Sequence, residues 1–153
     1  MPTPEERLQQ LGVSLPTPAA PVAAYVPCVR TGNLVYVSGQ VPSVDGKPTH
    51  LGHLGDDVDL EAGRAAARTC AVNVLAALKA ELGELSRVRR VVKVTGFVAS
   101  TADFTDHPKV VNAASELFGD VFGDAGRHAR AAVGVAALPL GVPVEVEAIV
   151  EVA

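Results

Sequence analysis

The sequence predicts one α+β domain in which two helices cover one face of a sheet. Runs rich in valine, typical of strands, occur within residues 28–42, 88–100 and 128–150, and two helix-like stretches separate them at 59–82 and 106–122. The 153 residues, 48% apolar and 20% charged, suffice for one sizeable core and make a second domain unnecessary. With 4% aromatic residues and no tryptophan, the core must consist mainly of Ala, Val and Leu.

The N-terminal part of the chain predicts a short helix followed by an extended segment. Residues 3–12 are expected to be helical, with Thr3 as the N-cap, Glu6 as its capping-box partner and Gly12 at the end. Residues 15–27 contain four prolines, so we expect them to run extended over the surface of the domain.

Residues 28–42 predict the first hairpin, with a turn at residues 31–33 and a return strand at residues 34–38. The strand is expected to stop at Ser38 and Gly39. The glycine at this point would let the backbone approach a neighbour or a ligand closely.

The polar, glycine-rich residues 43–58 predict a loop that carries two histidines. His50 and His53 are three positions apart, a spacing that can bind a metal on a helix. Gly52 and Gly55 favour a loop instead, and no third ligand follows at a fixed spacing. The sequence therefore predicts no metal site.

The first long helix is predicted from Asp59, its N-cap, through Leu82, with Gly83 as the C′ residue. Its many alanines would let it lie close to a sheet. The apolar stripe of this helix consists of Ala67, Ala71, Val74, Leu75, Leu78 and Leu82.

A strand at residues 88–100 and a second helix from Asp106 to Phe122, with Pro108 in its first turn, follow. In the strand we expect one face to carry Val92, Val94, Gly96 and Val98, and the other to carry Lys93, Thr95, Phe97 and Ala99. The buried side of the helix is predicted to contain Val111, Ala114, Phe118, Val121 and Phe122.

The C-terminal residues predict a second hairpin, with strands at residues 128–137 and 144–150 joined by a turn rich in proline and glycine. Antiparallel pairing would bring Arg130 near Glu145 and Glu147. The arginine then forms either a cross-strand ion pair on a solvated face or an anchor for an acid ligand. Sequence spacing alone does not decide between these two interpretations.

Composition and patterning also bear on partners and location. Alternation leaves Val and Ala on both faces of the strands, and no third helix is available for the second face, so we predict an oligomer. A net charge of −4 without a basic run argues against nucleic acid as a partner. No apolar stretch has the length of a signal peptide or a membrane span, which predicts a cytoplasmic protein.

The two cysteines, Cys28 and Cys70, have no CxxC spacing. They are interpreted as reduced, small hydrophobic residues, with a single disulfide or a catalytic thiol as alternatives.

Three segments in a fixed order resemble the Rid family of reactive-intermediate imine deaminases, also called YjgF-like or liver perchloric-acid-soluble-protein-like. They are AAYVPCVRTGNLVYVSGQVP, KVVNAASELF and HARAAVGVAALPLGVPVEVEAIV. The similarity covers the chain from about Pro21 to its C-terminus. This resemblance implies a chorismate-mutase-like α+β fold and a homotrimer whose sheets face inward, with clefts between its subunits.

The resemblance also implies functional positions. The family's substrate-carboxylate arginine falls on Arg130 and its cleft glutamate on Glu145; further matches are Tyr25, Ser38, Gly39 and Asn112. The chain departs from the family at Ala132, where many members have cysteine, and at His128, where proline is frequent. Residues 1–20 form an N-terminal extension, and the loop at residues 43–58 is also longer than in compact members.

The activity implied by the resemblance is hydrolysis of reactive 2-imino or enamine acids to 2-oxo acids and ammonia, without a cofactor. Arg130 would bind the substrate carboxylate, and Glu145 would position or deprotonate the attacking water. The Tyr25 side chain would form one wall of the pocket. His128 is a candidate proton carrier, with an exposed loop histidine as the alternative.

Two other functions remain open at this stage: a small-acid binding or regulatory trimer, and an endoribonuclease acting on single-stranded RNA. The acidic composition and the scarcity of aromatic side chains count against an RNA groove.

Overall fold

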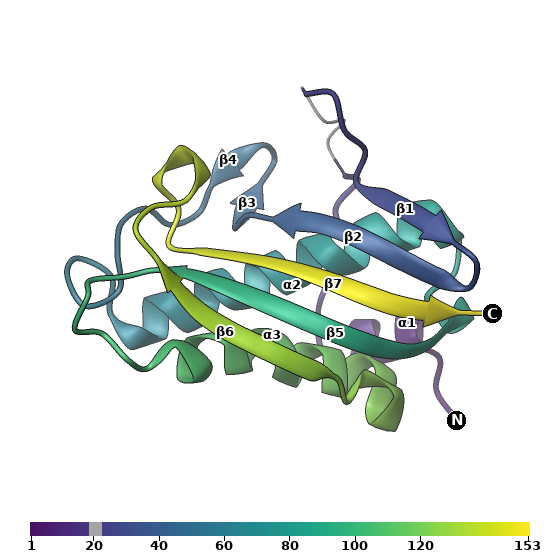
Figure 1. Ribbon diagram of the computed structural model, residues 1–153. Coiled ribbons are helices and arrows are strands. Elements are labelled where there is room, and N and C mark those ends of the chain that lie inside the picture. The colour runs from purple at the N-terminus through teal and green to yellow at the C-terminus, as the bar shows by residue number, and fades with distance from the viewer. Residues whose placement is uncertain (19–22) are drawn as a thin grey trace.

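A five-stranded mixed sheet and the helices behind it form the two layers of the protein (Figure 1). The computed structural model describes residues 1–18 and 23–153. The sheet has the order β1-β2-β7-β5-β6. Its strands are β1 (Cys28–Thr31), β2 (Leu34–Gln40), β5 (Val88–Ala99), β6 (Ala129–Val135) and β7 (Val144–Val152). The helices are α1 (Pro4–Gln10), α2 (Leu60–Leu82) and α3 (His107–Phe122), with short 3₁₀ helices η1 (Leu85–Arg87), η2 (Gly123–Gly126) and η3 (Pro139–Gly141).

The predicted N-terminal helix is confirmed as α1. The Thr3 side chain accepts a hydrogen bond from the Glu6 backbone N–H, and the Glu6 carboxylate accepts one from the Thr3 backbone, as a capping box requires. Lys79 of α2 bonds the Glu5 carboxylate at 2.8 Å, which ties α1 to the long helix. Of the segment expected to be extended, residues 15–18 and 23–27 contain no helix or strand, and the rest lies outside the described residues.

The predicted first hairpin is confirmed as β1 and β2, which pair antiparallel around Gly32. The return strand extends to Gln40, with a register shift against β7 between Val37 and Gln40. The loop prediction for residues 43–58 missed a small hairpin of β3 (Ser43–Val44) and β4 (Lys47–Pro48). Asp45 and Gly46 both have positive φ there, which is the signature of a two-residue Asp-Gly turn.

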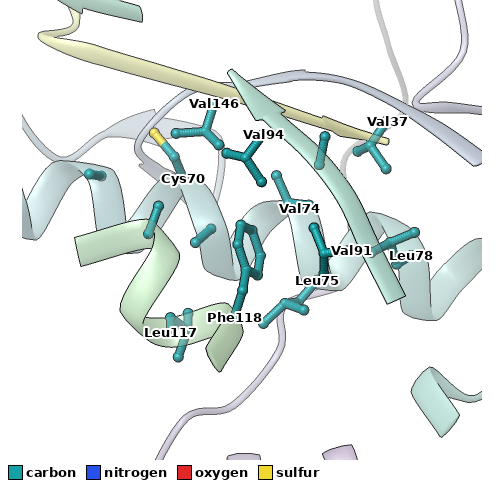
Figure 2. Close-up of a cluster of buried hydrophobic side chains, with 14 of the residues drawn as sticks. Val37, Cys70, Val74, Leu75, Leu78, Val91, Val94, Leu117, Phe118 and Val146 are labelled. Carbon is teal, nitrogen blue, oxygen red and sulfur yellow. The ribbon is translucent and has the colours of Figure 1, made fainter. Parts of the chain in front are cut away.

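Both long helices pack one face against the sheet. Figure 2 shows part of the core between the helices and the sheet. Asp59 caps α2 by accepting a hydrogen bond from the Ala62 N–H at 2.8 Å, and Gly83 ends the helix with a φ of 82°. Phe118 of α3 lies among side chains of α2 and β5 in this cluster. The labelled members are Val37, Cys70, Val74, Leu75, Leu78, Val91, Val94, Leu117, Phe118 and Val146. Burying about ten such side chains supplies the main driving force for joining the layers.

The face assignment predicted for the middle strand holds from Val94 onward and is wrong for Val92. A β-bulge shifts the register between Val91 and Lys93, so Val91 enters the core and Val92 is exposed. Farther along, a Cβ atom at Gly96 would lie 2.4 Å from Val111 of α3. This close approach lets α3 lie directly on β5.

The predicted C-terminal hairpin is wrong. Strand β6 pairs with β5 in parallel, and β7 pairs antiparallel with both β5 and β2, so β5 lies between β6 and β7 (Figure 1). The connecting residues 136–143 are longer than the two to five residues of a usual hairpin loop, and they cross the end of β5. The units β5, α3 and β6 instead form a βαβ crossover.

No helix of residues 1–18 and 23–153 lies on the second face of the sheet, and Figure 1 is seen from that side. Apolar side chains there are exposed, among them Val29, Tyr36 and Val133. The prediction that this chain leaves one sheet face uncovered is therefore confirmed. No helix among the described residues is long and apolar enough to cross a membrane.

Candidate functional site

The residues singled out by the sequence fall into two groups in the folded chain. The arginine group consists of Arg130, Asn112 and His128, between α3 and the edge strand β6, and the structure adds Ser115 to it. The glutamate group consists of Glu145 with Tyr25, Ser38 and Gly39, where β7 meets the end of β2.

Arg130 is held by three neutral oxygen atoms of α3. Its Nη1 donates to Asn112 Oδ1 at 2.8 Å and to Ser115 Oγ at 3.1 Å, and its Nη2 donates to the Pro108 carbonyl at 3.4 Å. Arg130 is in register with Val94 of β5, whose side chain is buried under the helices, so the arginine leaves the same face and reaches α3.

These contacts use both Nη1 hydrogens and one Nη2 hydrogen. The Nε hydrogen and the other Nη2 hydrogen have no hydrogen-bond partner among residues 1–18 and 23–153, and no carboxylate in this part of the chain pairs with Arg130. A guanidinium presents this pair of donors side-on to a carboxylate. The cross-strand ion pair with Glu145 or Glu147 is thus wrong, because β5 separates the two strands.

His128 lies just before β6 and is half-buried, so the interpretation as an exposed loop histidine is wrong. Its Nδ1 lies 2.6 Å from the Gly126 carbonyl and its Nε2 lies 2.9 Å from Ser115 Oγ. The edge of the Phe118 ring packs against the imidazole, with ring centroids 6.0 Å apart. Burial, and secondarily the charge of Arg130, lower the pKa of His128, which favours the neutral imidazole.

An open groove of about 330 Å³ adjoins the arginine group. Its lining residues are Ser115, Gly119, Gly126, Arg127, His128 and Arg130. The lining carries two guanidinium groups and no acidic side chain, so the groove favours an anion.

Glu145 occupies the opposite, uncovered face of the sheet. Alternation along β7 places Val144 and Val146 in the core and Glu145 outside it. A Cβ atom at Gly39 would lie 2.7 Å from Glu145 Oε2, so the glycine makes room for this carboxylate. The expectation that Gly39 permits a close backbone approach is confirmed, and the neighbour is a side chain of the same protein.

No cationic side chain among the described residues forms an ion pair with the Glu145 carboxylate. Burial raises its pKa, and the nearby Glu147 raises it further. No hydrogen bond to Glu145 occurs among the described residues. A half-buried carboxylate in this state can take up and release a proton closer to neutral pH than an ordinary glutamate.

Ser38 precedes Gly39 in β2, and its hydrogen bonds reach the segment that contains Tyr25. The Ser38 hydroxyl donates to the Val26 carbonyl at 2.8 Å, and the Ser38 N–H donates to the Pro27 carbonyl at 2.8 Å. These bonds fasten the segment that carries Tyr25 to strand β2. The Tyr25 side chain itself is 59% exposed.

The two groups do not meet within one chain. Arg130 is in register with Val94, and Val94 with Ala148, three residues from Glu145. Two strand spacings and three residues of rise separate the backbones of Arg130 and Glu145 by roughly 14 Å. Their side chains also leave opposite faces of the sheet.

Sequence reasoning missed Ser115, although a signal existed. Ser115 follows Asn112 by three positions, which places both on one face of a helix. Ala132 lies two residues beyond Arg130 and is partly buried against the core. Where a cysteine is expected from the resemblance, this chain therefore has a methyl group that cannot act as a nucleophile or a base.

Other candidate residues have structural partners. The ring of His50 bonds Thr49, and that of His53 bonds the Ala136 carbonyl. Across the described ranges no group of three or more metal-ligating side chains forms. Cys28 and Cys70 are buried free thiols in the core, which confirms their interpretation as small hydrophobic residues. Burial raises the pKa of Cys28 to about 11, which disfavours the reactive thiolate.

Comparisons with known proteins agree with the fold. Residues 5–151 match a family model described as "YjgF/chorismate_mutase-like, putative endoribonuclease". The chain is 50% identical to Protein TCP17 of Trypanosoma cruzi over 94% of its length and 91% of that protein. It is 37% identical to the 2-iminobutanoate/2-iminopropanoate deaminase of Salmonella typhimurium, over 86% and 89% of the two chains. The crystal structure of Atu1372 from Agrobacterium tumefaciens, a protein of unknown function, superposes with a TM-score of 0.92 at 50% identity, covering 98% and 92% of the chains.

Proposed function

The chain belongs to the YjgF/chorismate mutase-like family, and from this premise we propose that it hydrolyses small 2-imino acids to 2-oxo acids and ammonia. The cleft would form between neighbouring copies of the chain in a homotrimer. One copy would supply the arginine group and the next would supply the glutamate group.

The observation that carries this proposal is the state of Arg130. Three neutral oxygens hold its guanidinium, and no acidic side chain among the described residues neutralises it. Holding a charged group in one orientation is useful when a ligand of opposite charge completes the arrangement. A small carboxylate fits the two side-on donors that remain.

The uncovered sheet face supports assembly. Val29, Tyr36 and Val133 are 52%, 45% and 42% exposed there, and such a surface favours contact with another copy of the chain. Because Glu145 lies on that face, a neighbour packed against it could bring its own Arg130 toward this carboxylate. The opposite charges of the two groups favour such an approach.

The reaction follows from these roles. Arg130 holds the carboxylate of the protonated imine, and water adds to the imine carbon while Glu145 takes one of its protons. Glu145 then gives this proton to the nitrogen of the carbinolamine. Ammonia leaves as the C–N bond breaks, and the hydroxyl proton passes to Glu145 as the carbonyl forms. The carboxylate afterwards returns that proton to solvent.

The Salmonella relative is named for the four-carbon and three-carbon imino acids, and small substrates of this size are proposed here as well. Ser38, Gly39 and Asn112 would line the cleft. Tyr25 would close one side of it. The proposed reaction needs no cofactor.

A coupled assay tests the function. A threonine dehydratase generates the imino acid, and 2-oxobutanoate release is followed with and without the protein. We expect faster release, and we expect Arg130→Ala to lower the rate to that of spontaneous hydrolysis, a loss of at least about 100-fold. Binding of 2-oxobutanoate without faster release would contradict deamination and indicate a small-acid binding module.

A further inference from the structure

The hydrogen bonds around Ser115 have determined directions. A carbonyl oxygen can only accept, so His128 Nδ1 donates its hydrogen to Gly126. In the neutral imidazole Nε2 then has no hydrogen and accepts from the Ser115 hydroxyl. The Ser115 oxygen in turn accepts from Arg130 Nη1. One chain of hydrogen bonds therefore joins the Gly126 carbonyl to the guanidinium.

Ser115 and Asn112 together fix the plane of the guanidinium. Both accept from the same nitrogen, Nη1, and they lie one helical turn apart on α3. Two acceptors on one nitrogen oppose rotation of the planar group about the Cδ–Nε bond and oppose swinging of the whole side chain. The donors at Nε and Nη2 keep one direction as a result.

The groups that act on the imidazole come from three elements. Strand β6 contributes Arg130, α3 contributes the uncharged Ser115 and Phe118, and η2 contributes the Gly126 carbonyl. Arg127 lines the same groove. The cationic guanidinium therefore opposes protonation of His128 for as long as its own charge is not neutralised.

From this geometry we propose that Ser115 and His128 are positioning residues, which hold Arg130 ready for a carboxylate and couple acid binding to proton uptake by His128. The proposal rests on the proposed function in one respect, the assignment of Arg130 as the carboxylate anchor. Neither residue needs to touch the substrate.

The sign of the coupling follows from the charges. A carboxylate bound to Arg130 neutralises the guanidinium, so the imidazolium form costs less in the complex than in the free protein. The pKa of His128 is then higher with ligand than without. Binding takes up a proton at pH values between the two, and affinity rises as pH falls through the ligand-bound pKa.

Calorimetry with 2-oxobutanoate tests the coupling. Binding is measured near pH 6, in two buffers that differ in their heat of ionisation, and the difference in heat gives the number of protons taken up. We expect the wild type to take up clearly more of a proton than His128→Asn, in which only Glu145 of the proposed cleft is left to respond to the bound carboxylate. Ser115→Ala should weaken binding about 5-fold to 20-fold through the lost acceptor, and Ser115→Thr should restore most of it.

The protein offers a matched control. Ser100 and His107 form a second serine–histidine pair, with Oγ and Nε2 3.0 Å apart, but this serine does not bond Arg130. Ser100→Ala is expected to leave both the affinity and the proton uptake unchanged. An equal effect of Ser100→Ala and Ser115→Ala would overturn the proposal.

A measurement on the wild type covers the case in which a variant folds poorly. The chain has four histidines, and the imidazole C–H signal of His128 can be titrated by NMR with and without 2-oxobutanoate. A higher pKa with ligand supports the coupling, and an unchanged pKa in a protein that binds the acid overturns it while leaving the proposed function intact. Failure of the wild type to bind 2-oxobutanoate would overturn both.

Discussion

The arginine group and the glutamate group carry opposite charges and are held in opposite ways. Arg130 is fixed by hydrogen bonds that it donates to three acceptors, all of them neutral. Glu145 has no such bonds among the described residues and is placed by packing against Gly39, beside the like charge of Glu147. One group is rigid and ready to bind, whereas the other carries a destabilised charge that is ready to accept a proton.

If the chain acts as proposed, this difference gives each group a separate role in the reaction. An anchor gains from rigidity, because it sets where the reacting carbon lies. A proton carrier gains from a pKa near the working pH, which burial and a neighbouring carboxylate provide. The arginine group has the rigid anchor and the glutamate group has the proton carrier. Within one chain the two are kept apart, because β5 lies between their strands and they occupy opposite faces of the sheet.

The largest effect that separates the two roles is expected from Glu145→Gln. The amide cannot carry a proton, so kcat should fall by about 10²-fold to 10⁴-fold while binding of 2-oxobutanoate changes little. Steady-state kinetics and calorimetry measure the two quantities. Equal losses of kcat and affinity would show that Glu145 binds the acid as well, which contradicts the division.

Glu145→Gln, which is expected to lower kcat, is expected to raise the stability of the folded protein. Because the pKa of Glu145 is raised in the folded protein, its contribution to stability is present below the ordinary glutamate pKa and is lost as pH rises through the folded value. Glu145→Gln should therefore raise Tm at pH 7 and leave it unchanged at about pH 4. Thermal melts at the two pH values test this, and a lower Tm at pH 7 would contradict it.

A second, smaller effect is expected from Asn112→Asp. The new carboxylate would form an ion pair with Arg130 and compete with the ligand for its charge. Affinity for 2-oxobutanoate should fall about 10-fold, while the folded state stays at least as stable. Asn112→Ser, which keeps a neutral acceptor, serves as the control. Tighter binding in Asn112→Asp would show that the arginine does not meet a carboxylate.

The smallest effect is expected from Gly39→Ala. The added Cβ would lie 2.7 Å from the end of the Glu145 side chain, which is flexible and can move away. We expect a loss of kcat of about 3-fold to 10-fold with little change in Tm, since the fold loses no contact.

Gly96→Ala offers the contrast, because its Cβ would clash with the branched Val111 side chain in the core. That change should cost about 1–3 kcal/mol of stability.

Local sequence signals predicted the helices and the first hairpin well. Thr3, Asp59 and Gly83 mark helix ends through bonds or φ angles that depend on the residue itself. The Asp45–Gly46 turn carried an equally local signal and could have been predicted.

Strand pairing in the C-terminal part could not be predicted in this way. The sequence around Pro139 and Gly141 indicates a reversal of direction, but not whether the returning strand lies next to β6 or one strand farther on. That choice depends on β7 pairing with both β2 and β5, which are distant in sequence. The position of Arg130 relative to Glu145 follows from that choice. The separation of the two groups therefore could not be predicted from the sequence and was found only in the structure.

Subunit mixing tests the composite cleft most directly. Arg130→Ala and Glu145→Ala are each expected to be inactive, and the two are unfolded together in equal amounts and refolded. If every cleft takes its arginine from one copy and its glutamate from the next, about a quarter of the clefts in random trimers contain both intact groups. The mixture should then recover about a quarter of wild-type activity, while each variant refolded alone recovers none. No recovery in mixed oligomers would contradict a cleft shared between copies.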